Sequence, residues 1–379
     1  MQKIFDSSKV YGIALGGGGA KGGYEVGVWQ SLEEEGLRYN AVSGTSVGAL
    51  NGALMTMRDL PSAQRLWQEI KYSNVMDVDD DSMSRLYSRE IKPKEFRPLL
   101  RRVIGVVREG GLDVTPLRNL LAEHVDSEKI KSSDVALYVM TYSLTDKKGV
   151  EVDVRSLPAD EICDMLLASA YFPAFKNEPL AGGKRFTDGG VVDEVPISSL
   201  IKHGSKDIIA VRLRGSLGHE KRVRVPKDCS VLYIEPIRRL GNTLNFSSKQ
   251  AEYNIKLGYY DAKRFAYGLA GEYYYIDRTM TEKEAYDELF NMLSGSLKLM
   301  GKELSLRSMH ESLLPRIARE FEASGDYYDI LIKYLESAGA KLGIPEFRII
   351  TDRQLLSEVK AAATSGGVDI TPRSVSRLG

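Results

Sequence analysis

Ala41-Val42-Ser43-Gly44-Thr45-Ser46-Val47-Gly48 is the stretch that decides the fold. A short apolar run leads into a serine between Gly44 and Gly48, the pattern of a nucleophile elbow on a sharp strand-to-helix turn. Glycines at these two places let the backbone turn tightly and let a substrate approach. The helix expected to follow presents backbone N–H groups and the positive end of its dipole to developing negative charge. The pattern predicts Ser46 as a nucleophile.

A glycine cluster upstream, Gly16-Gly17-Gly18-Gly19, can supply a row of backbone N–H donors to an oxyanion. Residues 17–22 also fit the dinucleotide-binding pattern Gly-x-Gly-x-x-Gly, after a strand-like run over 10–15. A dinucleotide-binding fold would have an acidic residue at the end of the next strand, where this chain instead has the serine turn. A P-loop needs Ser or Thr after its lysine, whereas Gly22 follows Lys21. Acyl transfer through a serine ester is therefore favoured over nucleotide binding.

The bulk composition sets few further limits. The chain has 379 residues, enough for a substantial core and for more than one lobe. Its 52 Lys and Arg balance 52 Asp and Glu, so no general attraction to nucleic acid or to an anionic membrane is expected. There is no cluster with metal-ligand spacing, no secretory signal core and no apolar run of about 20 residues. We expect a cytoplasmic protein without metal or cofactor; the sequence does not indicate an oligomeric state.

Short apolar runs alternate with helical stretches in the first half, which predicts an α/β fold with crossover helices. Expected strands cover 10–15, 39–43, 135–144, 150–154, 208–213 and 231–234, and expected helices cover 20–35, 47–57, 159–170 and 243–269. Beyond 276 the chain is expected to be mainly helical to 363, followed by a loose polar tail over 364–379. Capping boxes mark three expected helix starts: Thr281 with Glu284, Ser308 with Glu311, and Thr351 with Gln354.

Residues 72–130 are expected to form a helical cap or insertion. Within it, the stretch 92–108 interleaves basic and apolar residues, as an interfacial helix does on a lipid surface. A cap helix packed on the core would show the same pattern, and Glu95 and Pro98 weaken the membrane interpretation. Both alternatives stay open.

A serine alcohol needs a base, and the histidines do not offer one. His124, His203, His219 and His310 lie in no convincing catalytic motif. Ser46 also follows only the second expected strand, whereas the elbow of α/β-hydrolases follows several. The remaining candidate is Asp188, in Phe186-Thr187-Asp188-Gly189-Gly190. Taken alone, Asp-Gly-Gly is typical of a turn.

In this order the three motifs resemble those of the patatin-like phospholipases. That family combines a Gly-Gly-Gly-x-Lys/Arg-Gly loop, a Gly-x-Ser-x-Gly elbow and an Asp-Gly-Gly/Ala motif, here at 17–22, 44–48 and 188–190. Residues 168–175 also resemble the family's segment before its aspartate. The resemblance implies a three-layer α/β fold with a central, mostly parallel sheet, as a catalytic domain over 8–275 followed by a mainly helical C-terminal lobe.

The resemblance also implies chemistry: a Ser-Asp dyad that hydrolyses fatty acyl esters of phospholipids or lysophospholipids. Ser46 would attack the ester carbonyl, Asp188 would take its proton, and backbone N–H groups of the loop would hold the oxyanion. The implied oxyanion residues are Gly17, Gly18 and Gly19, and the implied supporting residues are Lys21, Gly44, Gly48, Gly189 and Gly190. The partner would be a lipid ester, with peripheral membrane contact through 92–108.

One physical difficulty and two alternatives accompany this hypothesis. A carboxylate with a reference pKa near 3.9 is a weak base toward an alcohol, so the site has to raise its basicity by burial or stabilise the oxyanion strongly. A catalytically silent lipid-binding scaffold would keep the fold without the reaction. A nucleotide-binding domain would use the glycine loop for phosphates.

Overall fold

A computed structural model describes residues 3–87, 111–214 and 220–377. The chain divides into two compact units. The sheet unit is Phe5–Lys263, and the helical unit is Arg264–Gly379 together with Met1–Ile4. The expected interfacial stretch 92–108 lies outside the described residues.

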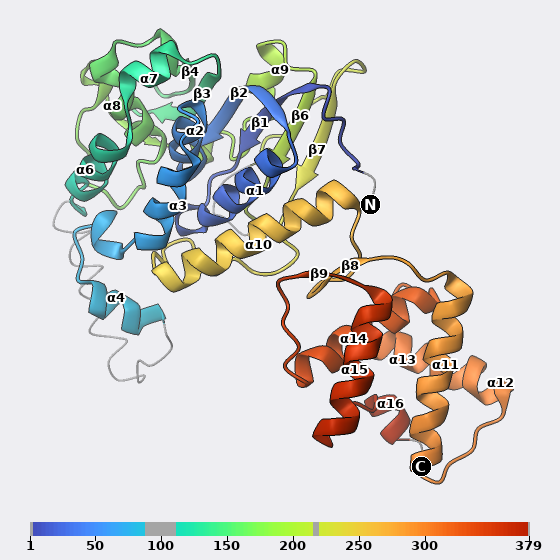
Figure 1. The fold of residues 1–379 in the computed structure, drawn as a ribbon. Coiled ribbons are helices and arrows are strands. Elements are labelled where there is room, and N and C mark those ends of the chain that lie inside the picture. The colour runs from blue at the N-terminus through green and yellow to red at the C-terminus, as the bar shows by residue number, and fades with distance from the viewer. Residues whose placement is uncertain (1–2, 88–110, 215–219, 378–379) are drawn as a thin grey trace. The chain divides into compact units, whose positions relative to one another are not determined.

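A seven-stranded, mostly parallel sheet forms the centre of the sheet unit (Figure 1). Its strands are β1 (Val10–Leu15), β2 (Arg38–Thr45), β3 (Ala136–Ser143), β4 (Lys148–Asp153), β5 (Phe186–Asp188), β6 (Asp207–Val211) and β7 (Ser230–Ile234). The order is β4-β3-β2-β1-β6-β7, and β5 also pairs with β3. Pairing is parallel from β3 through β2, β1 and β6 to β7, and antiparallel where β4 and β5 join β3. The expected α/β class is confirmed, and the strands expected over 135–144 and 150–154 pair as an antiparallel hairpin.

Helices surround this sheet (Figure 1). They are α1 (Gly23–Glu34), α2 (Val47–Thr56), α3 (Leu60–Glu69), α4 (Asp80–Tyr87), α6 (Thr115–His124), α7 (Ser127–Ser132), α8 (Ala159–Ser169), α9 (Ile197–Lys202) and α10 (Ser248–Tyr267). The helix expected over 20–35 is divided, because a short 3₁₀ turn, Gly19–Lys21, precedes α1.

The alternation of side chains along the strands gives the sheet two covered faces. On one face, Gly52 of α2 lies against Val42 and Leu137. On the opposite face, Ala14 is buried with Leu200 of α9. Because α2 and α9 pack on opposite faces, the sheet is the middle layer of three, as expected.

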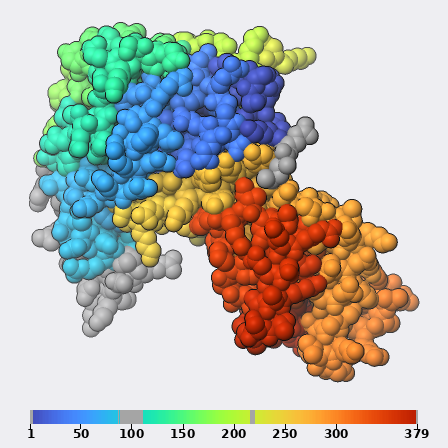
Figure 2. Space-filling model, in the orientation of Figure 1, coloured from blue at the N-terminus to red at the C-terminus, as the bar shows by residue number. Residues whose placement is uncertain are grey.

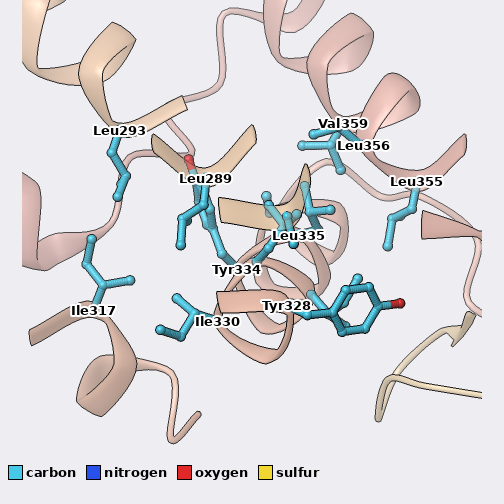
Figure 3. Packing of buried hydrophobic residues seen from close by; sticks show 14 of the residues in the cluster. Leu289, Leu293, Ile317, Tyr328, Ile330, Tyr334, Leu335, Leu355, Leu356 and Val359 are labelled. Atoms are coloured by element: carbon cyan, nitrogen blue, oxygen red, sulfur yellow. The ribbon is translucent and has the colours of Figure 1, made fainter. Parts of the chain in front are cut away.

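The helical unit contains a separate hydrophobic core (Figure 3). Its elements are β8 (Tyr275–Asp277), α11 (Glu282–Leu299), α12 (Leu306–Ser308), a π-helical turn (Met309–Leu313), α13 (Leu314–Glu320), α14 (Tyr327–Lys341), β9 (Ile349–Thr351), α15 (Asp352–Gly366) and α16 (Arg373–Ser376). Leu289 of α11, Ile317 of α13, Leu335 of α14 and Leu355 of α15 are fully buried in this core. The mainly helical C-terminal region is confirmed.

Ion pairs join α11 and α15, whose atoms lie next to each other in Figure 2. Arg353 contacts Glu284 at 2.6 Å, and Lys360 contacts Glu288 at 2.6 Å. These exposed pairs each add little to stability. The buried apolar side chains of the shared core, such as Leu289 of α11 and Leu355 of α15, therefore contribute more to the stability of this unit than these pairs do.

The helix starts of this unit agree with two of the three expected capping boxes. Thr281 with Glu284 and Thr351 with Gln354 both make the reciprocal hydrogen bonds. The box at Ser308 is wrong, because Ser305 caps α12 by accepting a hydrogen bond from the Ser308 N–H at 3.1 Å. Ser308 is therefore inside the helix.

Residues 364–377 include helical structure where the sequence predicts a loose tail. Helix α15 continues to Gly366, and α16 follows after a short connection. Val375 of α16 is fully buried in the core of the helical unit. Within the described parts of the chain, no helix combines the length and apolarity that crossing a membrane requires.

Candidate active site

Strands β2 and β5 pair with consecutive parts of β3. This register positions the residues of the site. The last residue of β2, Thr45, pairs with Met140 of β3. The next residue of β3, Thr141, pairs with Asp188 at the end of β5. Strand β5 runs antiparallel to β3, so its chain direction points toward the end of β2. Ser46, the residue after Thr45, is thereby brought beside Asp188.

Ser46 occupies the sharp turn between β2 and α2 that the sequence predicts. Its backbone has φ 55° and ψ −126°, a conformation that costs a non-glycine residue about 1–3 kcal/mol. A Cβ atom at Gly44 would collide with the Gly48 carbonyl, and one at Gly48 would collide with the Leu15 carbonyl. These two glycines are required because β2, α2 and β1 approach one another too closely for any side chain.

Asp188 lies deep in the site and accepts a hydrogen bond from the Gly190 N–H at 2.8 Å. Burial raises the pKa of Asp188 above its usual value, while hydrogen bonds from the Ser46 hydroxyl and the Gly190 N–H oppose the rise. Gly189 passes so close to the Met140 carbonyl that a side chain would collide with it. The structure thus joins the predicted serine and aspartate by a direct side-chain interaction and makes the aspartate a stronger base than an exposed carboxylate.

The glycine loop faces Ser46 and Asp188 across a shared cavity, lined by Gly17, Gly18 and Gly19. The Gly17 N–H donates to the Glu194 carbonyl at 3.0 Å. Within the described residues, no hydrogen-bond acceptor is found for the N–H groups of Gly18 and Gly19. Two backbone donors of the loop are therefore free to bind an oxygen anion, and the Gly17 donor is already engaged.

Lys21 helps to hold the glycine loop in place. Its side chain is only 3% exposed, and its Nζ donates to the Arg214 carbonyl at 2.9 Å. Burial lowers the pKa of Lys21, and the nearby Glu194 carboxylate opposes that change. Lys21 is not among the residues that line the cavity, so its contacts fit a structural role.

The cavity has a volume of about 260 Å³ and walls that are largely apolar. Helix α2 contributes Val47, Leu50 and Leu54, α3 contributes Leu66 and Trp67, and Ile70 follows α3. Further apolar walls come from Val75, Met76, Leu117, Leu120, Leu121, Val125, Ala170, Phe172, Pro173, Phe175, Val191, Leu244 and Phe246. Ser46 and Asp188 line the same cavity, so the site combines reactive side chains with largely apolar walls.

Ser169, at the end of α8, is a positioning residue that the sequence argument missed. Its Oγ accepts the Ser46 N–H at 2.9 Å, and its hydroxyl donates to the Met140 carbonyl at 2.6 Å. The side chain is fully buried. It therefore fastens the strained Ser46 backbone to β3. The only signal in the sequence was its place in the segment 168–175.

A buried polar network behind the cavity was also missed. Asn51 donates through Nδ2 to the Gly22 carbonyl at 3.0 Å and to the Glu25 carboxyl at 2.7 Å. The Trp67 indole N–H donates to Asn51 Oδ1 at 3.0 Å. Burial raises the pKa of Glu25 to about 8, although the Asn51 hydrogen bond opposes the rise. The network ties the end of the glycine loop to α2 and α3.

A third residue without a sequence signal is Glu194, which lines the cavity. Burial and the neighbouring Glu220 raise the pKa of Glu194 to about 7, with Lys21 acting in the opposite direction. The site therefore holds a second carboxyl group besides Asp188.

The histidines that the structure describes do not contact Ser46 or Asp188. His124, at the end of α6, lines the cavity, and His203 hydrogen-bonds to Glu151 at 2.9 Å. His310 lies in the helical unit, where its ring contacts Tyr286. His219 falls outside the described residues. Among the described side chains, Ser46 and Asp188 have no histidine partner.

Comparison with known proteins agrees with these motifs. Lysophospholipase NTE1 of Meyerozyma guilliermondii is 27% identical over 213 residues, 54% of this chain and 13% of that protein. An uncharacterized NTE family protein of Mycobacterium tuberculosis is 23% identical over 210 residues, 55% of this chain and 51% of that protein. The chain thus spans about half or less of the length of these relatives.

Among solved structures, VipD from Legionella pneumophila aligns with a TM-score of 0.42 and 15% identity, over 94% of this chain and 84% of VipD. The model of the patatin-like phospholipase family matches residues 13–201, one continuous stretch that contains the glycine loop, Ser46 and Asp188. Over these residues the chain belongs to the patatin-like phospholipase family.

Proposed function

We propose that this protein is a serine lipid acyl hydrolase that cleaves fatty acyl esters of phospholipids or lysophospholipids through Ser46 and Asp188. The observation that carries the proposal is the hydrogen-bonded contact of the Ser46 hydroxyl with a buried carboxylate, at the mouth of an apolar cavity. An apolar channel that ends at a nucleophile suits a substrate with a long hydrocarbon chain. The family and its lysophospholipase relatives support the same class of reaction.

In the proposed mechanism, Ser46 Oγ attacks the ester carbonyl carbon as its proton moves to Asp188. The N–H groups of Gly18 and Gly19 hold the negative oxygen of the tetrahedral intermediate. Collapse of this intermediate breaks the bond to the alcohol, which takes the proton from Asp188 and leaves an acyl ester on Ser46. Water then gives a proton to Asp188 and attacks the acyl ester, and the released serine oxygen recovers that proton as the fatty acid departs.

The burial of Asp188 addresses the weakness of a carboxylate base. Burial raises its pKa, so its affinity for the serine proton is higher than that of an exposed aspartate. The contribution of general-base assistance is roughly 10²–10⁴-fold, and each oxyanion donor adds about 10²–10³-fold. Together these contributions allow catalysis without histidine.

The test is covalent labelling with a fluorophosphonate probe, followed by identification of the modified residue. We expect labelling of the wild-type chain at Ser46 and none in Ser46→Ala. A silent scaffold would not be labelled, and labelling that survives in Ser46→Ala would place the nucleophile elsewhere. A thermal-shift comparison with NAD and ATP tests the alternative of nucleotide binding by the glycine loop.

Peripheral membrane contact through 92–108 remains a proposal from the sequence. Basic residues would face the headgroups, and apolar residues would enter the acyl region. Arg101→Glu combined with Arg102→Glu should weaken binding to anionic vesicles, most strongly at low salt. Hydrolysis of a short soluble ester should stay unchanged; an equal loss on both readouts would indicate a structural cap helix. With such contact, the protein would be cytoplasmic and peripheral on the membrane.

A further inference from the structure

Four arginines line one hollow on the helical unit. Arg316 and Arg319 project from α13, Arg373 begins α16, and Arg377 follows α16. The hollow has a volume of about 510 Å³, and Ser374 and Glu320 complete its lining. The two helices that carry the arginines pack against each other. We call this place the arginine hollow.

The carboxylate of Glu320 already accepts hydrogen bonds from the backbone of α16. One of its oxygens accepts the Arg373 N–H at 2.8 Å, and the other accepts the Ser374 N–H at 2.7 Å. Although burial alone would raise it, hydrogen bonds from Ser374 and Arg373 hold the pKa of Glu320 below its usual value. Glu320 is therefore ionised at neutral pH and fastens α16 to α13, but it balances only one of the four positive charges.

The four guanidinium groups of the arginine hollow have no carboxylate partners among the side chains that the structure describes. No ion pair joins any of them to a carboxylate within the described residues. Elsewhere in the unit cations have such partners: Arg278 with Glu282, Arg307 with Glu311, Lys333 with Glu272, Arg348 with Glu358, Arg353 with Glu284 and Lys360 with Glu288. The four arginines are exposed, so solvent screens much of their mutual repulsion, and an anion in the hollow would lower it further.

We propose that the arginine hollow binds a phosphomonoester dianion. Guanidinium groups match phosphate oxygens with paired, charge-assisted hydrogen bonds, and they stay charged at any physiological pH. Arg316 and Arg319 are three residues apart on α13 and so lie on one helix face, while Arg373 begins α16 and Arg377 follows its last residue. Two sources share this chemistry: the headgroup of a phosphatidate-like lipid and a soluble phosphate ester.

Binding is measured on the full chain carrying Ser46→Ala, so that no lipid is consumed and the result does not depend on hydrolysis. The soluble probe is glycerol 3-phosphate, followed by calorimetry. The lipid probe is a phosphatidylcholine vesicle containing phosphatidic acid, compared with one of equal charge containing phosphatidylglycerol, a phosphodiester. The test variant combines Arg316→Gln with Arg377→Gln. The matched control combines Lys283→Gln with Lys298→Gln, which removes the same charge from exposed positions of α11.

We expect the test variant to lose about tenfold or more in phosphomonoester affinity, because each lost charge-assisted hydrogen bond is worth about 1.5–3 kcal/mol. Its vesicle binding should fall to the level measured with phosphatidylglycerol, and the control variant should match the parent. Binding of both probes identifies a general phosphomonoester site, and binding of the vesicle alone identifies the lipid headgroup as its source.

Three results would overturn the proposal. The parent could bind neither probe, it could bind phosphatidylglycerol vesicles as tightly as phosphatidic acid vesicles, or the control variant could lose as much affinity as the test variant. The last two would indicate attraction by net charge alone. Thermal melting of each variant checks that α16 stays packed; Arg316→Gln alone, which leaves α16 unaltered, repeats the test if the double variant melts early.

Discussion

Thr45 and Asp188 pair with consecutive residues of β3, Met140 and Thr141. Ser46 follows Thr45 directly, so the sheet register itself fixes the distance between the serine and the aspartate. Ser169 adds a second tie to the same point, since it links the Ser46 N–H to the Met140 carbonyl. The proposed dyad is therefore positioned by pairing with β3, an inner strand of the sheet next to the edge strand β4.

Replacement of the proposed base is the first prediction. Asp188→Asn keeps the shape and an acceptor for the Gly190 N–H, but it removes the group that takes the serine proton. We expect kcat on a short soluble ester to fall by roughly 10²–10⁴-fold with thermal melting little changed. His124→Gln, which alters a histidine of the same cavity, is the matched control and should keep most activity. The same holds for His203→Gln, His219→Gln and His310→Gln; a folded but inactive histidine variant would reopen a triad.

The pH dependence of the reaction is the second prediction. Asp188 works as a base only when ionised, and burial raises its pKa. Activity should therefore decline as the pH falls through this raised pKa, and the decline should begin at a higher pH than for an ordinary aspartate. The profile of kcat/KM measures it. Glu194→Gln removes the other carboxyl group of the cavity, whose pKa is about 7. This variant should still lose activity at acid pH, because Asp188 is unchanged. A fall in kcat/KM near pH 7 that is absent in Glu194→Gln would instead report the titration of Glu194.

The local parts of this site follow from the sequence. The strand over 10–15, the Ser46 turn and the hairpin after 135 have short-range signals: apolar runs, flanking glycines and a turn. Each depends on residues close together in the chain. The helix caps at Thr281 and Thr351 are local in the same sense. At Ser308 the local pattern was ambiguous, because Ser305 offers a capping hydroxyl three residues earlier.

The long-range parts could not be derived from pattern alone. Asp188 comes next to Ser46 only because β5 pairs with β3 directly beyond the last residue of β2. No single segment of the sequence reveals this order of strands. The family resemblance, not the spacing, suggested their partnership. The cavity walls come from segments as distant as Trp67, Leu121 and Phe246. Ser169 gave no signal beyond its place in the segment 168–175, because a small buried serine is common in helices. Its role depends on the Ser46 N–H and the Met140 carbonyl, which are distant from it in the sequence.

The oxyanion donors give the third prediction. Replacing Gly19 by glycolic acid turns its amide into an ester, which removes the N–H without adding a side chain at a position with φ 54°. We expect kcat to fall by about 10²–10³-fold. The control is the same replacement at Gly17, whose N–H already donates to the Glu194 carbonyl. It should weaken the loop and lower the melting temperature more than it lowers kcat. Equal effects on kcat would mean that Gly17 also contacts the oxyanion.

Acyl-chain length is the fourth prediction. Leu50 and Leu54 line the cavity from α2, about 6 Å and 12 Å along the helix from Ser46. Leu54→Phe should shorten the channel, so kcat/KM for long-chain p-nitrophenyl esters should fall by about tenfold or more while short-chain esters react normally. Leu50→Phe enlarges a side chain close to the nucleophile and should slow all chain lengths alike. Both changes add volume to a packed wall, at a cost of about 1–3 kcal/mol, so melting temperatures are compared first. If Leu54→Phe slows short and long esters equally in a folded protein, the acyl chain does not run along α2.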